Sequence, residues 1–324
     1  MSRAPKAPPT DGILVIDKPS HRTSHDVVES ARRLVGFRGI GHLGTLDPLA
    51  TGVLVVALGR ATRLARFYAG RRKRYTCAVR FGFETDTYDA DGEALGPDSA
   101  PSLNPEAIAA LAARFLGKIQ QVPPAYSAKK IHGRPAHELA RKNKPVNLEP
   151  VEVEVFEFQL TGVEGSVARF TVECGAGTYI RSLAYDLGKL QGSGAHLAEI
   201  ARTAVGEFTL DDAHSLAELE QDAKAGRLLE RVIPLEKLLT DLPRATVLPI
   251  VEKRVRHGAK FNVSLAQIQP GQTSATQNGP AQLDAGDWKP SRLRVFSQQG
   301  QLIAIAEPVV PRTYQPLVVL EAMP

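Results

Sequence analysis

One carboxylate stands apart in this sequence. Asp47 lies in the loop GHLGTLDPLATG, residues 41–52, directly before the apolar run VLVVAL at 53–58. Pro48 favours an extended backbone at Asp47, and the glycines on either side permit close approach by a ligand or by another part of the chain. Pinned to a rigid strand, the carboxylate would project from a fixed platform into a cleft, available for chemistry. An Asp-Pro turn, in which Asp47 caps its own loop, is the alternative.

Arg181 is the second residue whose position needs a reason. It ends the segment GTYIR, residues 177–181, and falls in the first turn of an expected helix. A cation at this end opposes the helix macrodipole, at a cost of roughly 0.3–1 kcal/mol. A carboxylate partner within about 4–6 Å would offset this cost and would itself be stabilised in its ionised form. Asp47 and Asp89 are both candidates for that partner, and an exposed, solvated Arg181 is the alternative.

Two tyrosines and one histidine accompany these charges. Tyr75 follows the basic run RRKR at 71–74, and Tyr179 stands at the start of the expected helix. Aromatic rings at element ends beside cations can stack on unstacked nucleic-acid bases, although both rings also suit an apolar core. His42 precedes Asp47 by five residues and can be purely structural, because the eight histidines show no metal-ligand spacing.

The remaining motifs exclude the common cofactors. The segment TYDADG, residues 87–92, resembles the start of a calcium loop, but a threonine takes the first ligand position and Gly96-Pro97 would break the exiting helix. The chain has no P-loop, no dinucleotide-binding glycine motif after a strand and no nucleophile elbow. The sequence therefore predicts chemistry without a metal or a cofactor.

Charge points to a polyanionic partner such as nucleic acid. The net charge is +5, with basic runs at 71–74, 129–130 and 141–144. Any one of these runs could be an ordinary solvated face, but three of them in loops favour RNA or DNA as the ligand.

Composition predicts a cytoplasmic protein without a membrane segment. With 324 residues, 43% hydrophobic and 23% charged, the chain is typical of one or two globular domains. Its longest apolar run is far shorter than the roughly 20 residues of a spanning helix, and residues 1–10 read as a disordered tail without a secretory signal. Cys77 and Cys174 lie far apart, which indicates a reducing compartment.

Hydrophobic periodicity predicts an α+β fold with a mainly antiparallel sheet flanked by helices. The expected strands are 13–16, 75–81, 151–160 with a β-bulge between Val155 and Phe156, and 168–174. The expected helices begin at Thr23 or Ser24 and stop at Gly36, begin at Asn104 and end near Gly117, and run from about 180 to Gly188.

A change of pattern near residue 240 predicts a second domain. Beyond it helix signals vanish, and short β-type segments follow at 292–296 and 301–306. Residues 263–290 are rich in Gln, Gly, Ser and Pro and are expected to form a flexible loop. The predicted organisation is a tail over 1–10, a catalytic domain over 11–240 and a small β domain over 241–324.

Residues 11–240 resemble the TruB family, the bacterial tRNA pseudouridine-55 synthases. The matching segments follow the family order: DKPS (17–20), GHLGTLDPLATG (41–52), KRY (73–75), TDTYDADG (85–92), PPAYSAKK (123–130), GTYIR (177–181) and GAH (194–196). The resemblance implies a pseudouridine synthase fold and the isomerisation of one uridine in the T loop of tRNA, without cofactor or metal. The uridine must be flipped out of its stack, at a cost of a few kcal/mol.

The resemblance also implies roles for individual residues. Asp47 would be the catalytic carboxylate, Arg181 would keep it ionised and oriented, and Tyr75 would pack on the base and assist proton removal from C5. Substrate-binding positions are His42, Tyr75, Tyr179, Ile200, Lys18 and Lys130, and Asp89 would have a supporting role. Two departures from the family pattern are Leu43, which removes a hydroxyl, and Ala201, which replaces a basic residue.

The family further implies the partners. The enzyme would be a monomer that contacts the T arm and elbow of tRNA, with a mobile loop around 123–144, and the acceptor end through a PUA-like domain over 241–324. Two other functions remain open: an RNA chaperone that folds tRNA, alone or beside the isomerase activity, and a guide-RNA-dependent synthase with protein partners. The long loops of the catalytic region and the absence of lysine-rich tails argue against the guide-dependent enzyme.

Overall fold

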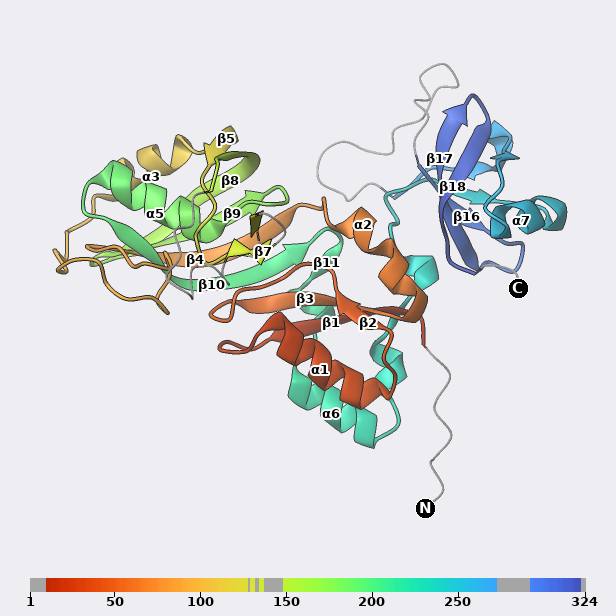
Figure 1. The fold of residues 1–324 in the computed structure, drawn as a ribbon, viewed down its shortest axis with the longest axis horizontal. Helices are drawn as coiled ribbons and strands as arrows, with labels where there is room; N and C mark the ends of the chain where they lie inside the picture. Colours follow the sequence, from red (N-terminus) through yellow and green to blue (C-terminus); the bar gives the residue numbers. More distant parts are fainter. Residues whose placement is uncertain (1–9, 128, 132–133, 137–147, 273–291, 322–324) are drawn as a thin grey trace.

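The protein is an α+β molecule built on two sheets, as predicted (Figure 1). The computed structural model describes residues 10–127, 129–131, 134–136, 148–272 and 292–321. In its large sheet the strands run β12 (Ile233–Pro234), β1 (Gly12–Lys18), β3 (Thr51–Leu58), β10 (Ala195–Val205), β4 (Lys73–Phe81), β9 (Val167–Cys174), β8 (Val151–Glu164) and β5 (Gly117–Gln121); β2 (Ile40–His42) pairs with β3, and β11 (Phe208–Thr209) with β10.

One parallel pairing in this sheet brings the site residues together. The described strands pair antiparallel throughout the large sheet except for β3 and β10, which run parallel where Gly52 faces Arg202. On the other side of β10, Arg202 faces Tyr75 of β4. The loop before β3 and the tyrosine of β4 therefore meet at the middle of the sheet, although 28 sequence positions separate Asp47 from Tyr75.

Helices cover the sheet in two pairs. The first pair is α1 (Ser24–Val35) and α6 (Leu216–Lys224), and the second is α3 (Pro105–Ala113) and α5 (Ile180–Gln191), placed towards opposite ends of the large sheet (Figure 1). The predicted caps of α1 are confirmed, because Thr23 and Asp26 form a capping box and Gly36 takes the left-handed conformation at the other end.

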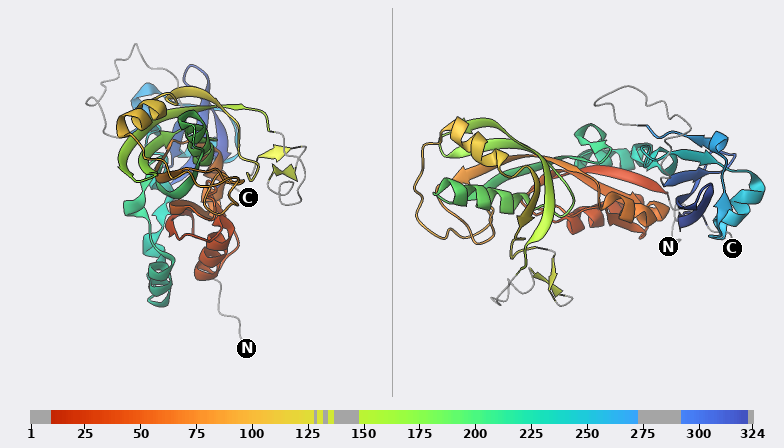
Figure 2. Two further views of the ribbon diagram at one scale, coloured as in Figure 1. Left: turned by 90° about the vertical axis from the view of Figure 1, so that its left-hand side faces the viewer. Right: turned by 90° about the horizontal axis from the view of Figure 1, so that it is seen from above.

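Short elements complete the chain between these helices and strands. They are α2 (Ala65–Tyr68), the hairpin β6 (Lys130–Ile131) and β7 (Arg134–Pro135), and the 3₁₀ helices η1 (Gly59–Leu64), η2 (Leu210–Asp212), η3 (Leu228–Arg231), η4 (Leu235–Lys237) and η5 (Leu265–Gln267). The hairpin projects from the large sheet (Figure 2).

Two predicted helix ends are wrong. The helix α5 passes Gly188 and ends at Gln191, followed by Gly192 in the left-handed conformation. Gly188 instead allows close packing, because a Cβ there would collide with the backbone of Ala195 at the start of β10. The helix α3 stops at Ala113, since the chain must turn before Gly117 begins β5. The predicted β-bulge in β8 is confirmed between Val155 and Glu157.

The C-terminal unit, residues 241–324, contains the second sheet. Its strands run β14 (Phe261–Asn262), β18 (Thr313–Val319), β17 (Leu302–Val310), β16 (Leu293–Phe296), β13 (Arg244–Thr246) and β15 (Ile268–Gln269). The expectation that helix signals vanish here is wrong, because α7 (Pro249–Arg256) packs against this sheet. Its proline suggests a break but occupies the first turn, where a missing N–H costs nothing. Residues 273–291, most of the predicted loop, lie outside the described residues.

The C-terminal unit and the large sheet share one apolar cluster. Phe296 and Ile305 from the second sheet pack in it with Leu64 and Tyr68 from the segment before β4. Arg71 and Asp241 form a bidentate ion pair across the same junction, with both N–O distances at 2.7 Å. Among the described helices, none is long and apolar enough to cross a membrane.

Candidate active site

A cavity of about 470 Å³ opens where the loop before β3, the strands β4 and β10, and the start of α5 meet. Six of the residues singled out from the sequence line it: His42, Asp47, Tyr75, Tyr179, Arg181 and Ile200. They come from distant parts of the chain, so the fold alone brings them to one cavity. Lys18 and Asp89 lie behind the cavity lining rather than in it.

The cavity is centred on the pair formed by Asp47 and Arg181. The two side chains meet through two contacts, Nε to Oδ2 at 2.9 Å and Nη2 to Oδ1 at 3.1 Å. The Arg181 side chain is only 5% exposed, whereas that of Asp47 is 41% exposed. Arg181 therefore holds the Asp47 carboxylate on one side and leaves its other side open to the cavity. The alternative interpretation of Arg181 as an exposed, solvated arginine is wrong.

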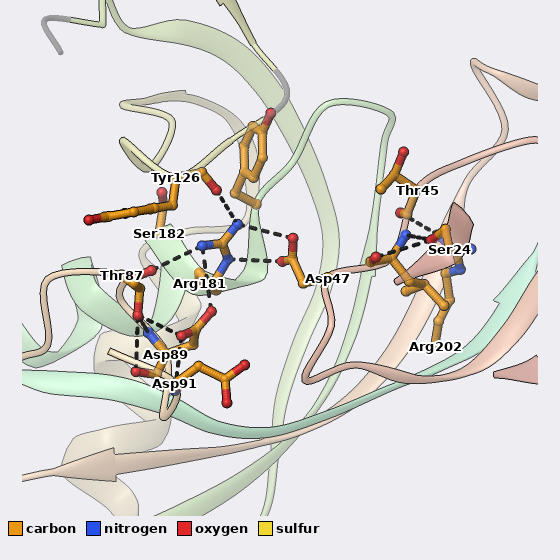
Figure 3. A network of polar contacts seen from close by, with 12 residues as sticks. Ser24, Thr45, Asp47, Thr87, Asp89, Asp91, Tyr126, Arg181, Ser182 and Arg202 are labelled. Atoms are coloured by element: carbon orange, nitrogen blue, oxygen red, sulfur yellow. Dashed lines mark hydrogen bonds and ion pairs between the residues drawn. The ribbon is translucent and has the colours of Figure 1, made fainter. Parts of the chain in front are cut away.

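Arg181 is itself held in place by several acceptors. It donates hydrogen bonds to the carbonyl oxygens of Thr87 at 3.1 Å and Tyr126 at 2.9 Å, and it approaches Asp89 Oδ2 at 3.5 Å (Figure 3). Both carboxylates considered as partners thus contact Arg181. These contacts explain how a cation is tolerated in the first turn of α5.

Asp89 is a buried carboxyl group with mixed influences on its ionisation. Burial raises the pKa of Asp89, while the hydroxyl of Thr87, the charge of Arg181 and the backbone N–H of Asp91 oppose that rise. Thr87 Oγ1 donates to Asp89 Oδ1 at 2.6 Å, and Asp91 N donates to the same oxygen at 3.2 Å. The segment that resembles a calcium loop serves to fix Asp89 behind Arg181.

Lys18 fixes the loop that carries Asp47. Its Nζ donates to the carbonyl oxygens of Pro19, Pro48 and Ala50, the last at 2.6 Å, and the residue is fully buried. Burial lowers the pKa of Lys18 to about 8. The Lys18 amine therefore binds backbone carbonyl oxygens, including those on both sides of Leu49, and does not line the cavity.

The two tyrosines face the cavity from different elements. Tyr75 is buried in the core cluster and lines the cavity as well, so the structural and the functional interpretation are both compatible with its position. Burial raises the pKa of Tyr75 to about 12, opposed by the charge of Arg202. Tyr179 is half-buried, and burial raises its pKa while a hydrogen bond with Ser127 opposes the rise.

His42 and Ile200 complete the predicted set. Burial, together with the charges of Arg202 and His25, lowers the pKa of His42, which is therefore a neutral ring at pH 7. Ile200 lies on β10 opposite Cys77 of β4 and contributes an apolar wall. Lys130 lies in β6, and its side chain is outside the described residues, as is half of the loop around 123–144.

Several residues of this site were missed in the sequence. Gln121 brackets the backbone of Tyr179, accepting from its N–H at 2.8 Å and donating to its carbonyl at 3.1 Å. Ser24 bonds both backbone groups of Leu46. Nothing local marks either residue, because these contacts span 58 and 22 positions. Arg202 was also missed, although its position two residues after Ile200, on the same strand face, is a signal that the sequence does contain.

Two family models match the chain. The one described as "TruB family pseudouridylate synthase (N terminal domain)" matches residues 32–180, and the one described as "tRNA pseudouridylate synthase B C-terminal domain" matches 181–240. A protein named tRNA pseudouridine synthase B from Solibacter usitatus (strain Ellin6076) is 43% identical, over 96% of this chain and all of the relative. This chain belongs to the TruB family. The predicted family, and with it the prediction of a tRNA pseudouridine synthase, an isomerase, is confirmed.

A second relative and a solved structure are also similar to this chain. A tRNA pseudouridine synthase B from Thermotoga maritima (strain ATCC 43589 / DSM 3109 / JCM 10099 / NBRC 100826 / MSB8) is 37% identical, over 91% of this chain and 89% of the relative. Among solved structures, a chain in the "Crystal Structure of a Cbf5-Nop10-Gar1 Complex" superposes with a TM-score of 0.71 at 23% identity, covering 96% of this chain and 85% of that chain. This second similarity shows a shared fold.

Proposed function

We propose that this TruB enzyme isomerises uridine 55 in the T loop of tRNA and that Asp47 is its catalytic carboxylate. The observation that supports this role is the grip of a buried Arg181 on a carboxylate that stays open to the cavity. A flipped base and its ribose need such a cavity, since a uridine inside a folded loop is out of reach.

The chemistry follows from the charge that develops on the sugar. Breaking the bond between C1′ and N1 builds positive charge on the ribose, and an ionised carboxylate beside it stabilises that charge. The base then turns, a bond forms between C1′ and C5, and the proton lost from C5 is balanced by one gained at N1. Arg181 holds Asp47 in its orientation and supplies the counter-charge throughout.

The other cavity residues would hold the flipped base. Tyr75 packs on the ring and assists proton removal from C5, Tyr179 and Ile200 form the walls, and neutral His42 fills the space that the extruded base leaves. Gln121 supports this arrangement, because its paired hydrogen bonds fix the backbone from which the Tyr179 ring projects.

Binding of tRNA would extend beyond this cavity. A second cavity of about 710 Å³ lies between the large sheet and the C-terminal unit and is lined by the basic run Arg71–Arg74. Phosphate contacts by such cations dominate nucleic-acid affinity. We propose that residues 11–240 bind the T arm and elbow, with Lys130 on the projecting hairpin. Residues 241–324 then act as a PUA-like domain at the acceptor end, in a monomeric, cytoplasmic enzyme.

Mapping on an unmodified tRNA transcript tests the substrate position. Pseudouridine is detected by carbodiimide-blocked primer extension, because isomerisation leaves the mass unchanged. The expected result is one strong stop that reports position 55 and that disappears when uridine 55 is replaced by cytidine. Stops at other uridines, or none, would contradict the assignment.

A tRNA chaperone function is supported by the position of the second cavity. Its basic run lies outside the catalytic cavity except for Lys73, which lines both. Gripping tRNA therefore does not require the chemistry. The Asp47→Asn variant should accelerate refolding of misfolded tRNA as well as the wild type does, and a variant without effect on refolding would exclude this function.

A further inference from the structure

Arg202 is the most completely buried of the described cations that line the cavity. It lies on β10 between Tyr75 of β4 and Gly52 of β3, and it is 1% exposed. Gly52 allows this approach, since a Cβ there would collide with the Arg202 carbonyl. No carboxylate lies within 4 Å of its side chain among the residues that the structure describes. A buried guanidinium without an ion-pair partner needs other acceptors to compensate its lost hydration.

Those acceptors belong to the catalytic loop. Arg202 Nη2 donates to the carbonyl of Gly44 at 3.0 Å, Nη1 to that of Thr45 at 3.2 Å, and Nε to that of Val53 at 2.8 Å. The first two acceptors lie just before Asp47, and the third lies in the strand after it. One rigid, planar group therefore spans both ends of the segment that carries the catalytic carboxylate.

Arg202 also faces Tyr75, its partner across the paired strands β10 and β4. The positive charge of Arg202 opposes the rise in the pKa of Tyr75 that burial causes. Figure 3 shows Arg181 and Arg202 on opposite sides of Asp47. Arg181 contacts the carboxylate itself, whereas Arg202 binds the backbone of the same loop and pairs through β10 with the strand that carries Tyr75.

We propose that Arg202 is a positioning residue of the reaction, which fixes the loop of Asp47 relative to the strand that carries Tyr75. The inference rests on the proposed roles of Asp47 and Tyr75. Arg202 lines the cavity, but with 1% of the residue exposed it acts through the two elements that carry Asp47 and Tyr75. Misplacement of a catalytic group by about 1 Å can cost about 100-fold in rate.

Arg202→Lys tests this, because it keeps the charge but loses the fork that reaches several acceptors. The rate constant for a single turnover at saturating enzyme should fall about 10- to 100-fold. The dissociation constant for tRNA should change less than about threefold, since Arg202 is shielded from phosphates. If Arg202→Lys does not fold at the assay temperature, Arg202→Met, which keeps a similar volume, takes its place.

Arg294 provides a matched control. It is also buried and donates to three carbonyl oxygens, those of Glu236, Leu238 and Leu242, but it lies in the C-terminal unit. Arg294→Lys should lower the melting temperature by about as much as Arg202→Lys does, while its single-turnover rate stays within about twofold of the wild-type rate. An equal loss of rate in both variants, or a wild-type rate in Arg202→Lys, would overturn the proposal.

A double-mutant cycle with Tyr75→Phe separates positioning from general support. Because Arg202 and Tyr75 face each other on paired strands and line one cavity, the rate losses of Arg202→Lys and Tyr75→Phe should multiply to more than the loss in the double variant. Fully independent losses would contradict a shared role. Asp47→Asn is assayed alongside: activity in that variant would refute the role of Asp47, whereas an inactive Asp47→Asn beside a fully active Arg202→Lys would refute only the inference on Arg202.

Discussion

Two bidentate arginine–aspartate pairs occupy different regions of this molecule. Asp47 pairs with Arg181 in the cleft, and Asp241 pairs with Arg71 at the junction with the C-terminal unit. Both aspartates are 41% exposed, so the carboxylates alone do not distinguish the two regions. The arginines do, because Arg181 is 5% exposed and Arg71 is 24% exposed.

The two pairs differ in how firmly the arginine is held. Arg181 is surrounded by other acceptors, so it stays in place whether or not Asp47 engages a substrate. Arg71 is closer to water, and screening reduces what its pair contributes to stability. A charge that is fixed on one side and open on the other can act on a ligand, whereas a pair with both members near solvent mainly joins two surfaces.

The largest effect is expected from breaking the cleft pair. Arg181→Met should reduce the single-turnover rate by about 100- to 1,000-fold, because Asp47 loses its orientation and its counter-charge. Affinity for tRNA should fall far less, since phosphate contacts lie elsewhere. Filter binding beside single-turnover kinetics measures both quantities, and Arg181→Lys is the control that restores charge without the bidentate geometry. A rate within tenfold of the wild type would show that the pair is structural.

The next effect concerns the ring that faces the same carboxylate. Tyr75→Phe keeps the stacking surface but removes the hydroxyl, so the rate should fall about 100-fold if that hydroxyl assists proton transfer. The affinity for tRNA should stay near that of the wild type. Equal rates for the two proteins would limit Tyr75 to stacking and would leave proton removal to another group.

A smaller effect should appear as a pH dependence set by Lys18. Burial lowers the pKa of Lys18 to about 8, so rising pH neutralises it in the folded protein before the unfolded chain, where its pKa is 10.5. Between these two pKa values the unfolded state binds more protons than the folded state, so the free energy of unfolding increases as the pH rises.

The same titration should weaken the support of the Asp47 loop. A neutral amine can donate fewer hydrogen bonds than the carbonyl oxygens of Pro19, Pro48 and Ala50 accept from the charged group. The single-turnover rate should therefore fall by about 3- to 10-fold as the pH rises, with a midpoint at the Lys18 pKa of about 8.

The variant Lys18→Met identifies the titrating group. Its rate should be lower at every pH, and the step near pH 8 should be absent. A step that persists in Lys18→Met would assign the titration to another residue.

The smallest effect is expected from breaking the junction pair. Arg71→Met should lower stability by no more than about 1 kcal/mol, because a partly exposed pair is screened. The melting temperature should fall by about 2–4 °C, and the difference from wild type should shrink in high salt. Single-turnover rates should agree within about twofold. A loss of rate as large as that of Arg181→Met would erase the distinction between the two regions.

Much of the cleft could be predicted from the sequence because local rules apply to it. The macrodipole argument at Arg181 required a carboxylate partner, and the structure supplies both candidates, Asp47 and Asp89. The residues around Asp47 also carry the resemblance to the TruB family, which the comparisons confirm.

The rest depends on contacts between distant segments. The backbone bonds of Arg202 reach the catalytic loop across about 150 positions, and no periodicity reports them. The end of α5 was misjudged because Gly188 serves packing against β10 and not helix termination. Helix α7 was overlooked because its proline looks like a break until its place in the first turn is known.

In our proposal, one carboxylate performs the chemistry while other residues bind the tRNA. The decisive variant is Asp47→Asn, because it replaces a charged oxygen by an amide of nearly the same shape. Pseudouridine formation in a single turnover should fall at least about 1,000-fold, with the dissociation constant for tRNA changed only a few-fold. Product formed by Asp47→Asn at a rate near that of the wild type would show that Asp47 is not the catalytic carboxylate.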